Sequence, residues 1–280
     1  MNIGIIGLGL MGASMGLAVR KYTEKMMIYG ADMNKKHVDY CINHGIIDNI
    51  LSAEKLVQQD VIFIAVPVRS ILDVIEQIEP LINKEKTIIT DMGSTKSEIV
   101  MMVKKKFPDI RFIGGHPMTG REMSGPAAAL ADLFQNKNYI LTEKTDDHIL
   151  INILETVGAH IVVMEAEKHD RLAAFTSHVP QFLATSVIQR LKNVEKNNPE
   201  VTQLIGQGFK DLTRIAASDP RMWQDIFVSN REQVITQIEE LQEELDFFKK
   251  TIKHRDEDKI YEIIESGRKK RVELGEKNEA

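Results

Sequence analysis

Short apolar runs alternate with longer amphipathic stretches over residues 1–164. Three runs, at residues 2–6, 26–31 and 61–66, are almost continuously apolar and have the length of strands. Such runs are typical of parallel strands covered on both faces of a sheet. Further strands are expected at 87–91, 110–113, 139–142 and 160–164. Amphipathic patterns predict helices at 13–21, 70–82, 96–105, 127–134 and 146–157. The alternation predicts an α/β fold with a doubly wound, mostly parallel sheet.

The pattern changes near Glu165, after which no convincing strand follows. A long helix is expected from 165 to about 193, interrupted or kinked at Pro180, because proline removes a helical hydrogen bond. Asp219-Pro220 supplies an N-cap followed by proline, so a second long helix is expected to run from there to about residue 254. A short helix at 201–206 and a final helix at 256–274 complete the pattern. We therefore predict two domains, residues 1–164 and an all-helical domain at 165–280.

One stripe of the second long helix is apolar at alternating spacings of four and three. Its members are Val234, Ile238, Leu241, Leu245, Phe248 and Ile252. Such a stripe is buried against another helix. Packing within one subunit and packing between two subunits both satisfy it.

Composition narrows the class of protein. The 280 residues are 43% hydrophobic and 28% charged, with a formal net charge of −5, which gives no basic footprint for nucleic acid. The single cysteine, Cys41, excludes an internal disulfide and makes the cytoplasm the natural compartment. We expect no signal peptide, because the amino terminus lacks a basic start and an apolar stretch, and no transmembrane helix, because no window holds eighteen apolar residues. No metal site is predicted.

A glycine-rich turn follows the first predicted strand and opens the first helix. It reads Gly7-Leu8-Gly9-Leu10-Met11-Gly12, which fits the G-x-G-x-x-G pattern of dinucleotide-binding loops in Rossmann-type folds. Gly7 makes the tight turn, Gly9 lets the backbone approach a pyrophosphate, and Gly12 lets the helix pack closely on the strand. The helix amino terminus then faces the phosphates. These six residues are therefore predicted to bind a nicotinamide cofactor, together with Val66 and Pro67 at the end of the 61–66 strand.

Asp32 lies at the end of the second strand, twenty residues after Gly12. An acidic side chain there accepts hydrogen bonds from the ribose hydroxyls of NAD and repels the 2′-phosphate of NADP. NAD is therefore favoured, although the nearby Lys35 and Lys36 leave NADP open. The alternative is that Asp32 only caps the helix beginning near Asn34.

The stretch from Gly114 to Gly125 contains the strongest candidate for acid–base chemistry. His116 follows the 110–113 strand, flanked by glycines and stiffened by Pro117. A histidine on a stiff loop at a strand end suits proton transfer, although an isolated Gly-His-Pro is more often a surface turn. Ser94 follows the 87–91 strand, so both residues lie at the carboxyl edge of the sheet, where ligands bind in such folds. Ser94 also suits the N-cap of the next helix.

Taken together, these segments are similar to those of the prephenate and arogenate dehydrogenase family over nearly the whole chain. The resemblance rests on residues 7–12, 91–96, 115–120, 177–180, 211–214 and 218–223. It implies a nicotinamide domain followed by a helical domain that builds a homodimer. It also implies NAD-dependent oxidative decarboxylation of prephenate to 4-hydroxyphenylpyruvate in tyrosine biosynthesis.

The resemblance implies roles for individual residues. The histidine at position 116 accepts a hydrogen bond from the substrate hydroxyl, Ser94 orients that hydroxyl, and Arg214 binds a substrate carboxylate. Because the substrate is a dianion, a cationic fork is also expected on physical grounds. The resemblance further implies a substrate pocket that includes His178, Gln181, Thr119, Glu122 and Trp223. Gln181 departs from the family, because many relatives have a second histidine there, and this bears on the choice between prephenate and arogenate.

Three alternatives stay open from the residues alone. An arogenate dehydrogenase is the nearest one. A β-hydroxyacid dehydrogenase shares the two-domain plan, but it usually places a lysine on a helix of the second domain, whereas the polar pair here lies on the sheet edge. A non-catalytic NAD-binding sensor belongs to another class and predicts that His116 is dispensable.

Overall fold

The computed structural model describes residues 1–23, 26–121 and 123–276. Within it the chain divides into two compact units, Met1–Arg231 and Glu232–Ala280. The first unit carries the predicted sheet, His116 and the residues that hydrogen-bond it. The predicted division at residue 164 concerns sequence domains and stays a prediction.

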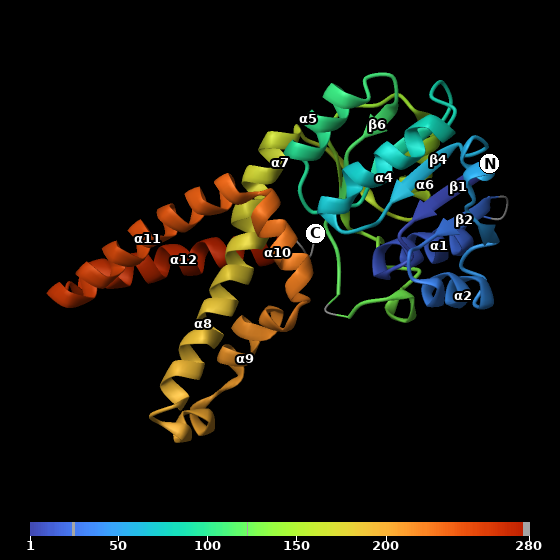
Figure 1. The fold of residues 1–280 in the computed structure, drawn as a ribbon. Coiled ribbons are helices and arrows are strands. Elements are labelled where there is room, and N and C mark those ends of the chain that lie inside the picture. The colour runs from blue at the N-terminus through green and yellow to red at the C-terminus, as the bar shows by residue number, and fades with distance from the viewer. Residues whose placement is uncertain (24–25, 122, 277–280) are drawn as a thin grey trace. The chain divides into compact units, whose positions relative to one another are not determined.

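A six-stranded parallel sheet forms the centre of the first unit (Figure 1). Its strands are β1 (Asn2–Ile6), β2 (Met27–Ala31), β3 (Asn49–Ile50), β4 (Val61–Ile64), β5 (Ile88–Asp91) and β6 (Arg111–Ile113), in the order β3-β2-β1-β4-β5-β6. All five neighbouring pairs are parallel. The predicted doubly wound sheet is therefore confirmed, and of its six strands the sequence pattern missed the two-residue strand β3.

Helices cover both faces of this sheet. The first face carries α1 (Leu10–Tyr22) and α2 (Lys35–Asn43), whose buried side chains join Ile3, Ile5 and Phe63 in one core. The second face carries α3 (Ala53–Leu56), α4 (Ile71–Ile78) and α5 (Ser97–Lys106), which pack on Ile62 and Ile64. Short 3₁₀ turns, η1 (Val68–Ser70) and η2 (Glu79–Leu81), flank α4. Burial on both faces explains why these strands are continuously apolar.

The later strands form a separate sheet. β7 (Gly115–Pro117) pairs antiparallel with β8 (Asn138–Leu141), which pairs parallel with β9 (His160–Val163). The helix α6 (His148–Thr156) connects β8 with β9 and packs on the first core. The predicted helix at 127–134 is wrong: the chain makes only a 3₁₀ turn, η3 (Pro126–Ala128), followed by turns. Gly125 and Asn136, both with positive φ, bound this segment and oppose helical geometry.

Only helices and turns follow β9 among the described residues, as the pattern predicts. They begin with α7 (Ala166–Ala173), a π-helical turn η4 (Ala174–His178) and α8 (Val179–Glu195). The interruption expected at Pro180 is therefore the π-turn just before it, because proline has no N–H to continue the ladder. The chain continues through η5 (Pro199–Leu204), α9 (Gln207–Thr213), η6 (Arg214–Ala217) and α10 (Pro220–Ser229). The helix expected at 201–206 is thus a 3₁₀ turn.

The predicted long helix from Pro220 to residue 254 is two helices. Asp219 caps α10 by accepting from the N–H groups of Arg221 and Met222, as expected, but α10 ends at Ser229. A new helix, α11 (Arg231–His254), then begins after Asn230. The amide of Asn230 hydrogen-bonds residues of α7 and η4, which holds the break in place.

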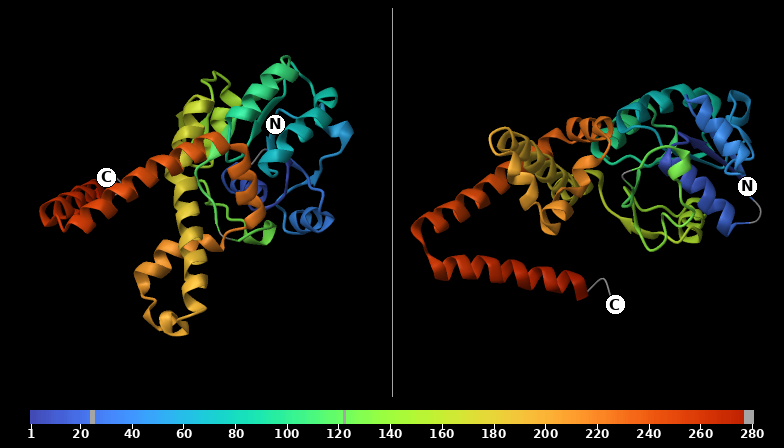
Figure 2. Two further views of the ribbon diagram at one scale, coloured as in Figure 1. Left: turned by 60° about the vertical axis from the view of Figure 1, so that its left-hand side comes forward. Right: turned by 90° about the horizontal axis from the view of Figure 1, so that it is seen from below.

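The second unit consists of α11 and α12 (Glu257–Glu276). The chain turns back at Arg255, which has positive φ, and the two helices diverge from that turn in the second view of Figure 2. Of the apolar stripe on α11, Leu245 and Ile252 are exposed by 55% and 54% in the single chain.

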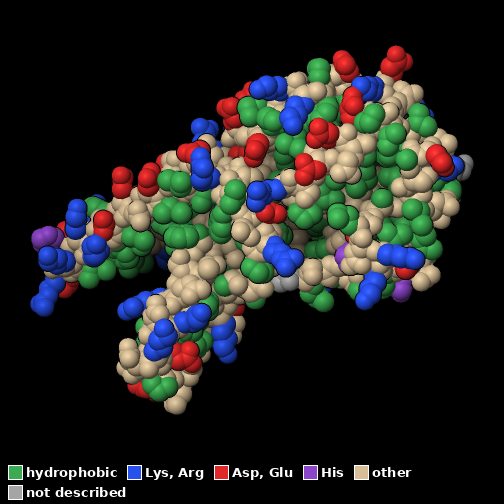
Figure 3. All heavy atoms as spheres, viewed as in Figure 1, with side chains coloured by type: hydrophobic (Ala, Val, Ile, Leu, Met, Phe, Trp, Pro, Cys, Tyr) green, Lys and Arg blue, Asp and Glu red, His purple; other side chains and the backbone are tan. Residues whose placement is uncertain are grey.

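The surface of the sheet-bearing part carries both signs of charge. On the face shown in Figure 3, acidic and basic side chains are interspersed with hydrophobic ones over this part. No helix in the described ranges is long and apolar enough to span a membrane.

Candidate active site

His116 lies in β7, at the point where the chain leaves the large sheet for the small one. The sequence predicts a loop here, but the backbone of His116 is paired in register with Ile140 of β8. The close approach of β7 to β5 requires glycine just before the histidine, since a Cβ on Gly115 would meet the carbonyl oxygen of Asp91 at 2.5 Å. Because β7 is fixed by pairing on one side and by packing on the other, His116 has a rigid backbone.

A chain of hydrogen bonds runs from His116 into the interior. Nδ1 of His116 lies 2.8 Å from Nε2 of His169, and Nδ1 of His169 lies 2.8 Å from Oδ1 of Asp170. His169 and Asp170 are 3% and 2% exposed, whereas His116 is only partly buried. The accessible end of the chain is therefore His116. Sequence reasoning missed both partners, although the adjacent His-Asp pair in α7 is visible in the sequence.

Asp170 also caps the helix α5. Its Oδ1 accepts from the backbone N–H of Lys96 and its Oδ2 from that of Ser97, so a residue of α7 performs the capping that we expected of Ser94. The N-cap position itself is Lys96, not Ser94. The pKa of Asp170 is lowered: burial opposes ionisation, but hydrogen bonds from His169, Ser97 and Lys96 outweigh it.

A buried ion pair lies beside this chain. Lys96 and Asp91 are both fully buried and form a salt bridge, and Nζ of Lys96 also donates to the carbonyl oxygen of Gly115 at 2.9 Å. The Asp91 carboxylate in turn accepts from the N–H groups of Gly93 and Gly115. Burial lowers the pKa of Lys96, although Asp91 opposes that shift. The pair fixes the end of β5 to the residue that precedes His116.

His116 is held neutral by its surroundings. Burial lowers its pKa well below 6.5, and the positive charge of the neighbouring Lys96 lowers it further by Coulombic repulsion. A neutral imidazole accepts a proton through whichever nitrogen is bare. His116 is therefore suited to act as a base near neutral pH.

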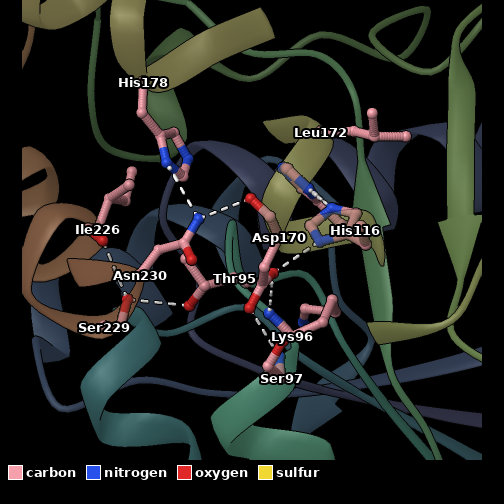
Figure 4. A network of polar contacts seen from close by, with 12 residues as sticks. Thr95, Lys96, Ser97, His116, Asp170, Leu172, His178, Ile226, Ser229 and Asn230 are labelled. Carbon is pink, nitrogen blue, oxygen red and sulfur yellow. Dashed lines mark hydrogen bonds and ion pairs between the residues drawn. The ribbon is translucent and has the colours of Figure 1, made fainter. Parts of the chain in front are cut away.

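A second set of hydrogen-bonded polar residues, centred on Asn230, lies among the helices that follow β9 (Figure 4). Nδ2 of Asn230 donates to the carbonyl oxygen of Asp170 at 2.8 Å and lies 3.3 Å from Nδ1 of His178. Burial lowers the pKa of His178 to about 4, so the ring is neutral and its Nδ1 accepts from the amide. The Nε2–H of His178 is then a donor. The hydroxyl of Ser229, the residue before Asn230, forms a hydrogen bond of 2.9 Å with the hydroxyl of Thr95. This bond connects α10 to the loop after β5.

Two buried polar atoms of the predicted substrate pocket have no hydrogen-bond partner among the described residues. They are Oε1 of Gln181 and Nε1 of Trp223. Gln181 is 4% exposed, and the Trp223 ring packs edge-on against His178 with centroids 6.0 Å apart. Buried polar atoms are usually paired, so an acceptor and a donor left open here are consistent with a ligand that pairs them.

The remaining predicted substrate residues are spread over three segments. Ser94 is partly buried in the loop after β5, and Thr119 is partly buried just beyond β7. Arg214 is exposed at the start of η6, which packs on α8. Glu122 falls outside the described residues. The roles of these four residues toward a substrate stay predictions.

The glycine-rich loop has the geometry expected of a cofactor cradle. Gly7 has φ of +96°, and Gly12 lies so close to Gly7 that a Cβ would meet its carbonyl oxygen at 1.9 Å. Gly9, the N-cap of α1, has open space where a Cβ would lie. Leu8 is fully buried, whereas Leu10 and Met11 are partly buried. The loop thus leaves backbone accessible at Gly9, where a pyrophosphate is expected.

Asp32 braces this loop. Its Oδ2 accepts from the N–H of Leu8 at 2.7 Å and lies 3.3 Å from Nδ1 of His37, and its Oδ1 accepts from the N–H of Asn34. The cap of α2 is Asn34 itself, so the capping role considered for Asp32 is not observed. Val66 is partly buried, with a methyl group that a Cβ on Gly7 would meet at 3.0 Å, and Pro67 is exposed beside it. These residues fit a dinucleotide. In the described ranges, no three His, Cys, Asp or Glu side chains are grouped to hold a metal ion.

A family model described as prephenate dehydrogenase, nucleotide-binding domain, matches residues 15–163, and one described as prephenate dehydrogenase, dimerization domain, matches residues 165–266. The chain belongs to the prephenate dehydrogenase family.

Individual relatives agree with the family models. The chain is 37% identical over 268 residues to a prephenate dehydrogenase of Lactococcus lactis, covering 95% of this chain and 75% of the relative. It is 33% identical over 274 residues to one of Bacillus subtilis, covering 94% and 73%. Among solved structures, the prephenate dehydrogenase of Aquifex aeolicus in complex with hydroxyphenyl propionate and NAD⁺ has a TM-score of 0.90 at 32% identity, covering 98% of both chains. The Rossmann-type sheet followed by a helical part is therefore the fold of this family.

Proposed function

We propose that the protein oxidises prephenate with NAD, releasing carbon dioxide and giving 4-hydroxyphenylpyruvate for tyrosine biosynthesis. One observation carries the proposal: a neutral, partly exposed histidine stands on the carboxyl edge of a dinucleotide-binding sheet. The loops after β1, β4 and β5 and the residues after β6 all leave the sheet at this edge, because its strands are parallel. We infer the identity of the substrate from the family and from the names of its relatives.

The chemistry needs one base. Prephenate has a ring carbon that carries hydrogen and hydroxyl, opposite a carbon that carries carboxylate. NAD, when bound, accepts the hydride from the first carbon. His116 draws the hydroxyl proton as the hydride leaves, the electrons of the carbon–carboxylate bond enter the ring, and carbon dioxide departs. His116 then returns the proton to the phenol oxygen. A positioned base of this kind contributes typically about 10²–10⁴-fold to rate.

The other residues bind and orient in this proposal. Ser94 orients the hydroxyl beside His116, and Arg214 binds a carboxylate with its fork of donors. Thr119 lines the pocket after β7, and His178 donates to substrate through Nε2. A substrate-binding role for Glu122, which lies outside the described residues, is part of the same proposal. The Asp32 carboxylate accepts hydrogen bonds from the ribose hydroxyls of NAD. The position of Asp32 supports this role, because its carboxylate connects the end of β2 to the glycine-rich loop.

Arogenate is a second candidate substrate, and a specific observation favours considering it. Oε1 of Gln181 is a buried acceptor without a partner among the described residues, and arogenate has an amino group where prephenate has a keto group. NADH formation is measured after mixing the purified protein with NAD and each acid. Rapid turnover of prephenate supports the proposal, and turnover of arogenate alone overturns it.

We further propose a cytoplasmic homodimer that assembles through the helical part. The match of residues 165–266 to a dimerization domain supports the dimer, as do the exposed Leu245 and Ile252 on α11. The single buried Cys41, which cannot form an internal disulfide, supports the compartment. Sedimentation of the full chain tests the dimer, and a species with the mass of one chain at micromolar concentration overturns it.

A further inference from the structure

We propose that His169 and Asp170 form a relay that keeps the Nε2 of His116 bare and then takes up the positive charge when His116 accepts the substrate proton. The inference rests on the proposed function for its chemistry, but its geometry is independent of any substrate. His169 and Asp170 are positioning residues, because they act through His116.

The direction of the hydrogen bonds follows from the carboxylate. An ionised carboxylate only accepts, so Nδ1 of His169 must donate to Asp170 over their 2.8 Å contact. In neutral His169 the other nitrogen, Nε2, is then bare and accepts from Nδ1–H of His116, also at 2.8 Å. That bond leaves Nε2 of His116 as the bare nitrogen. The tautomer of the accessible histidine is thus set by a carboxylate two residues away in the chain of contacts.

The surroundings of Asp170 allow His169 to be neutral at rest. The carboxylate already accepts from the N–H groups of Lys96 and Ser97 at the start of α5, where the helix dipole also favours negative charge. It therefore does not require a cationic partner. The two rings are nearly perpendicular, with an interplanar angle of 76° and centroids 5.0 Å apart.

The same chain can receive the proton. When the hydroxyl O–H bond breaks, an N–H bond forms at Nε2 of His116. The proton on Nδ1 of His116 moves to Nε2 of His169, which becomes a cation hydrogen-bonded to Asp170. No electrons are transferred among these groups, and the reverse movement returns the proton to the phenol oxygen. The cation then lies beside the Asp170 carboxylate, whereas the charge of Lys96 disfavours a proton on His116 itself.

Two other titratable side chains, Lys96 and His178, lie close to the relay. Lys96 is paired with Asp91, which lies on β5, and His178 is bound to Asn230. Neither hydrogen-bonds the nitrogens that connect His116 to His169. A purely structural alternative is that the relay only joins α7 to β7 and has no influence on which nitrogen of His116 carries the proton.

The first experiment reads the tautomers directly. Full-length protein with ¹⁵N-labelled histidine is examined near neutral pH by two-bond ¹⁵N–¹H correlation, and the variant His116→Gln assigns the His116 signal. The relay predicts protonated Nδ1 and bare Nε2 for both His116 and His169. A proton on Nε2 of His116, or doubly protonated His169, overturns it. Because no substrate is present, this result does not depend on the proposed function.

The second experiment separates positioning from structure by conservative rescue. His169→Leu removes the acceptor, and His169→Gln restores one through its amide oxygen. For His169→Leu we expect kcat with prephenate to fall by about 10²-fold, within the range for a positioned acid–base group, while the Kd for NAD stays within about twofold. His169→Gln should recover at least about tenfold of that loss. Equal turnover in all three proteins overturns the relay.

These outcomes are distinguishable from failure of the proposed function. If the unaltered protein oxidises no prephenate, the proposed function fails and the tautomer spectrum alone decides the relay. If prephenate is oxidised but His169→Leu is as fast as the unaltered protein, the relay fails and the proposed function stands. If His169→Leu does not fold, His169→Gln and the labelled unaltered protein still give both readouts.

Discussion

The side-chain amide of Asn230 lies 3.3 Å from Nδ1 of His178 and donates to the carbonyl oxygen of Asp170, so one residue at the break between α10 and α11 holds two parts of the site. Asn230→Ala removes both bonds and frees His178 to change tautomer. We expect KM for prephenate to rise about three- to tenfold, the equivalent of one hydrogen bond, and the protein to lose about 1–3 kcal/mol of stability. Steady-state kinetics and urea unfolding measure these effects. Asn198→Ala, which removes an exposed amide that donates to the local carbonyl oxygen of Val194, is the control and should change neither.

Gly115 is expected to tolerate no side chain. A Cβ would meet the Asp91 carbonyl oxygen at 2.5 Å and a ring carbon of Tyr139 at 2.9 Å. Gly115→Ala should therefore cost about 1–3 kcal/mol through overpacking and displace His116, so that kcat falls along with the melting temperature. Gly208→Ala, in α9 with nothing within 4 Å, should leave both unchanged or raise stability slightly. Equal melting temperatures for the two variants would contradict the packing described.

Stability should fall as the pH drops from 6.5 towards 4. The pKa of His178 is lowered to about 4 and that of His116 is well below 6.5, both by burial, so in this window the unfolded chain binds protons that the native protein does not. The free energy of unfolding then rises with pH, by about 3 kcal/mol for His178 alone. Asp170, whose pKa is lowered, loses its contribution only below about 3.8.

Urea unfolding at a series of pH values measures this slope. His178→Leu should flatten it, whereas His160→Leu, which removes an exposed histidine of β9, should not. A free energy of unfolding that stays constant between pH 4 and 6.5 would contradict the lowered pKa values of these buried histidines.

Asp32 should determine the preference for NAD over NADP. Asp32→Asn removes a carboxylate that repels a 2′-phosphate and accepts from ribose, and it weakens the bond to the N–H of Leu8. We expect kcat/KM for NAD to fall at least about tenfold and the ratio of NADP to NAD efficiency to rise. Asp39→Asn, an exposed residue of α2, makes the same change of charge nearby and should alter neither value. If both variants keep the original preference, Asp32 does not contact the ribose.

Local patterns predicted the elements that depend on them. The continuous apolar runs gave the strands because burial on both faces leaves no polar position, and the glycine spacing at 7–12 gave the loop because Gly7 and Gly12 have no room for a side chain. Asp219-Pro220 marked a helix start because both act within one turn. Ser94 and His116 were predicted to lie at the same edge of the sheet because the carboxyl ends of parallel strands meet there.

Features that depend on distant contacts were not predictable in this way. β7 is a strand because β8 pairs with it, although its own three residues have no strand pattern. The break at Asn230 follows from bonds to α7 and η4, and α5 is capped by Asp170 from more than seventy residues away. His169 and Asp170 look like ordinary helix residues until the fold brings them behind His116.

The measurement that tests the account most directly is NADH formation from prephenate by the unaltered protein and by His116→Asn. We expect the variant to bind NAD normally and to lose about 10²–10⁴-fold in kcat, because the base is removed while the cofactor loop is untouched. His148→Asn, an exposed histidine of α6, should behave like the unaltered protein. Unchanged turnover in His116→Asn would contradict the role of His116 as the base.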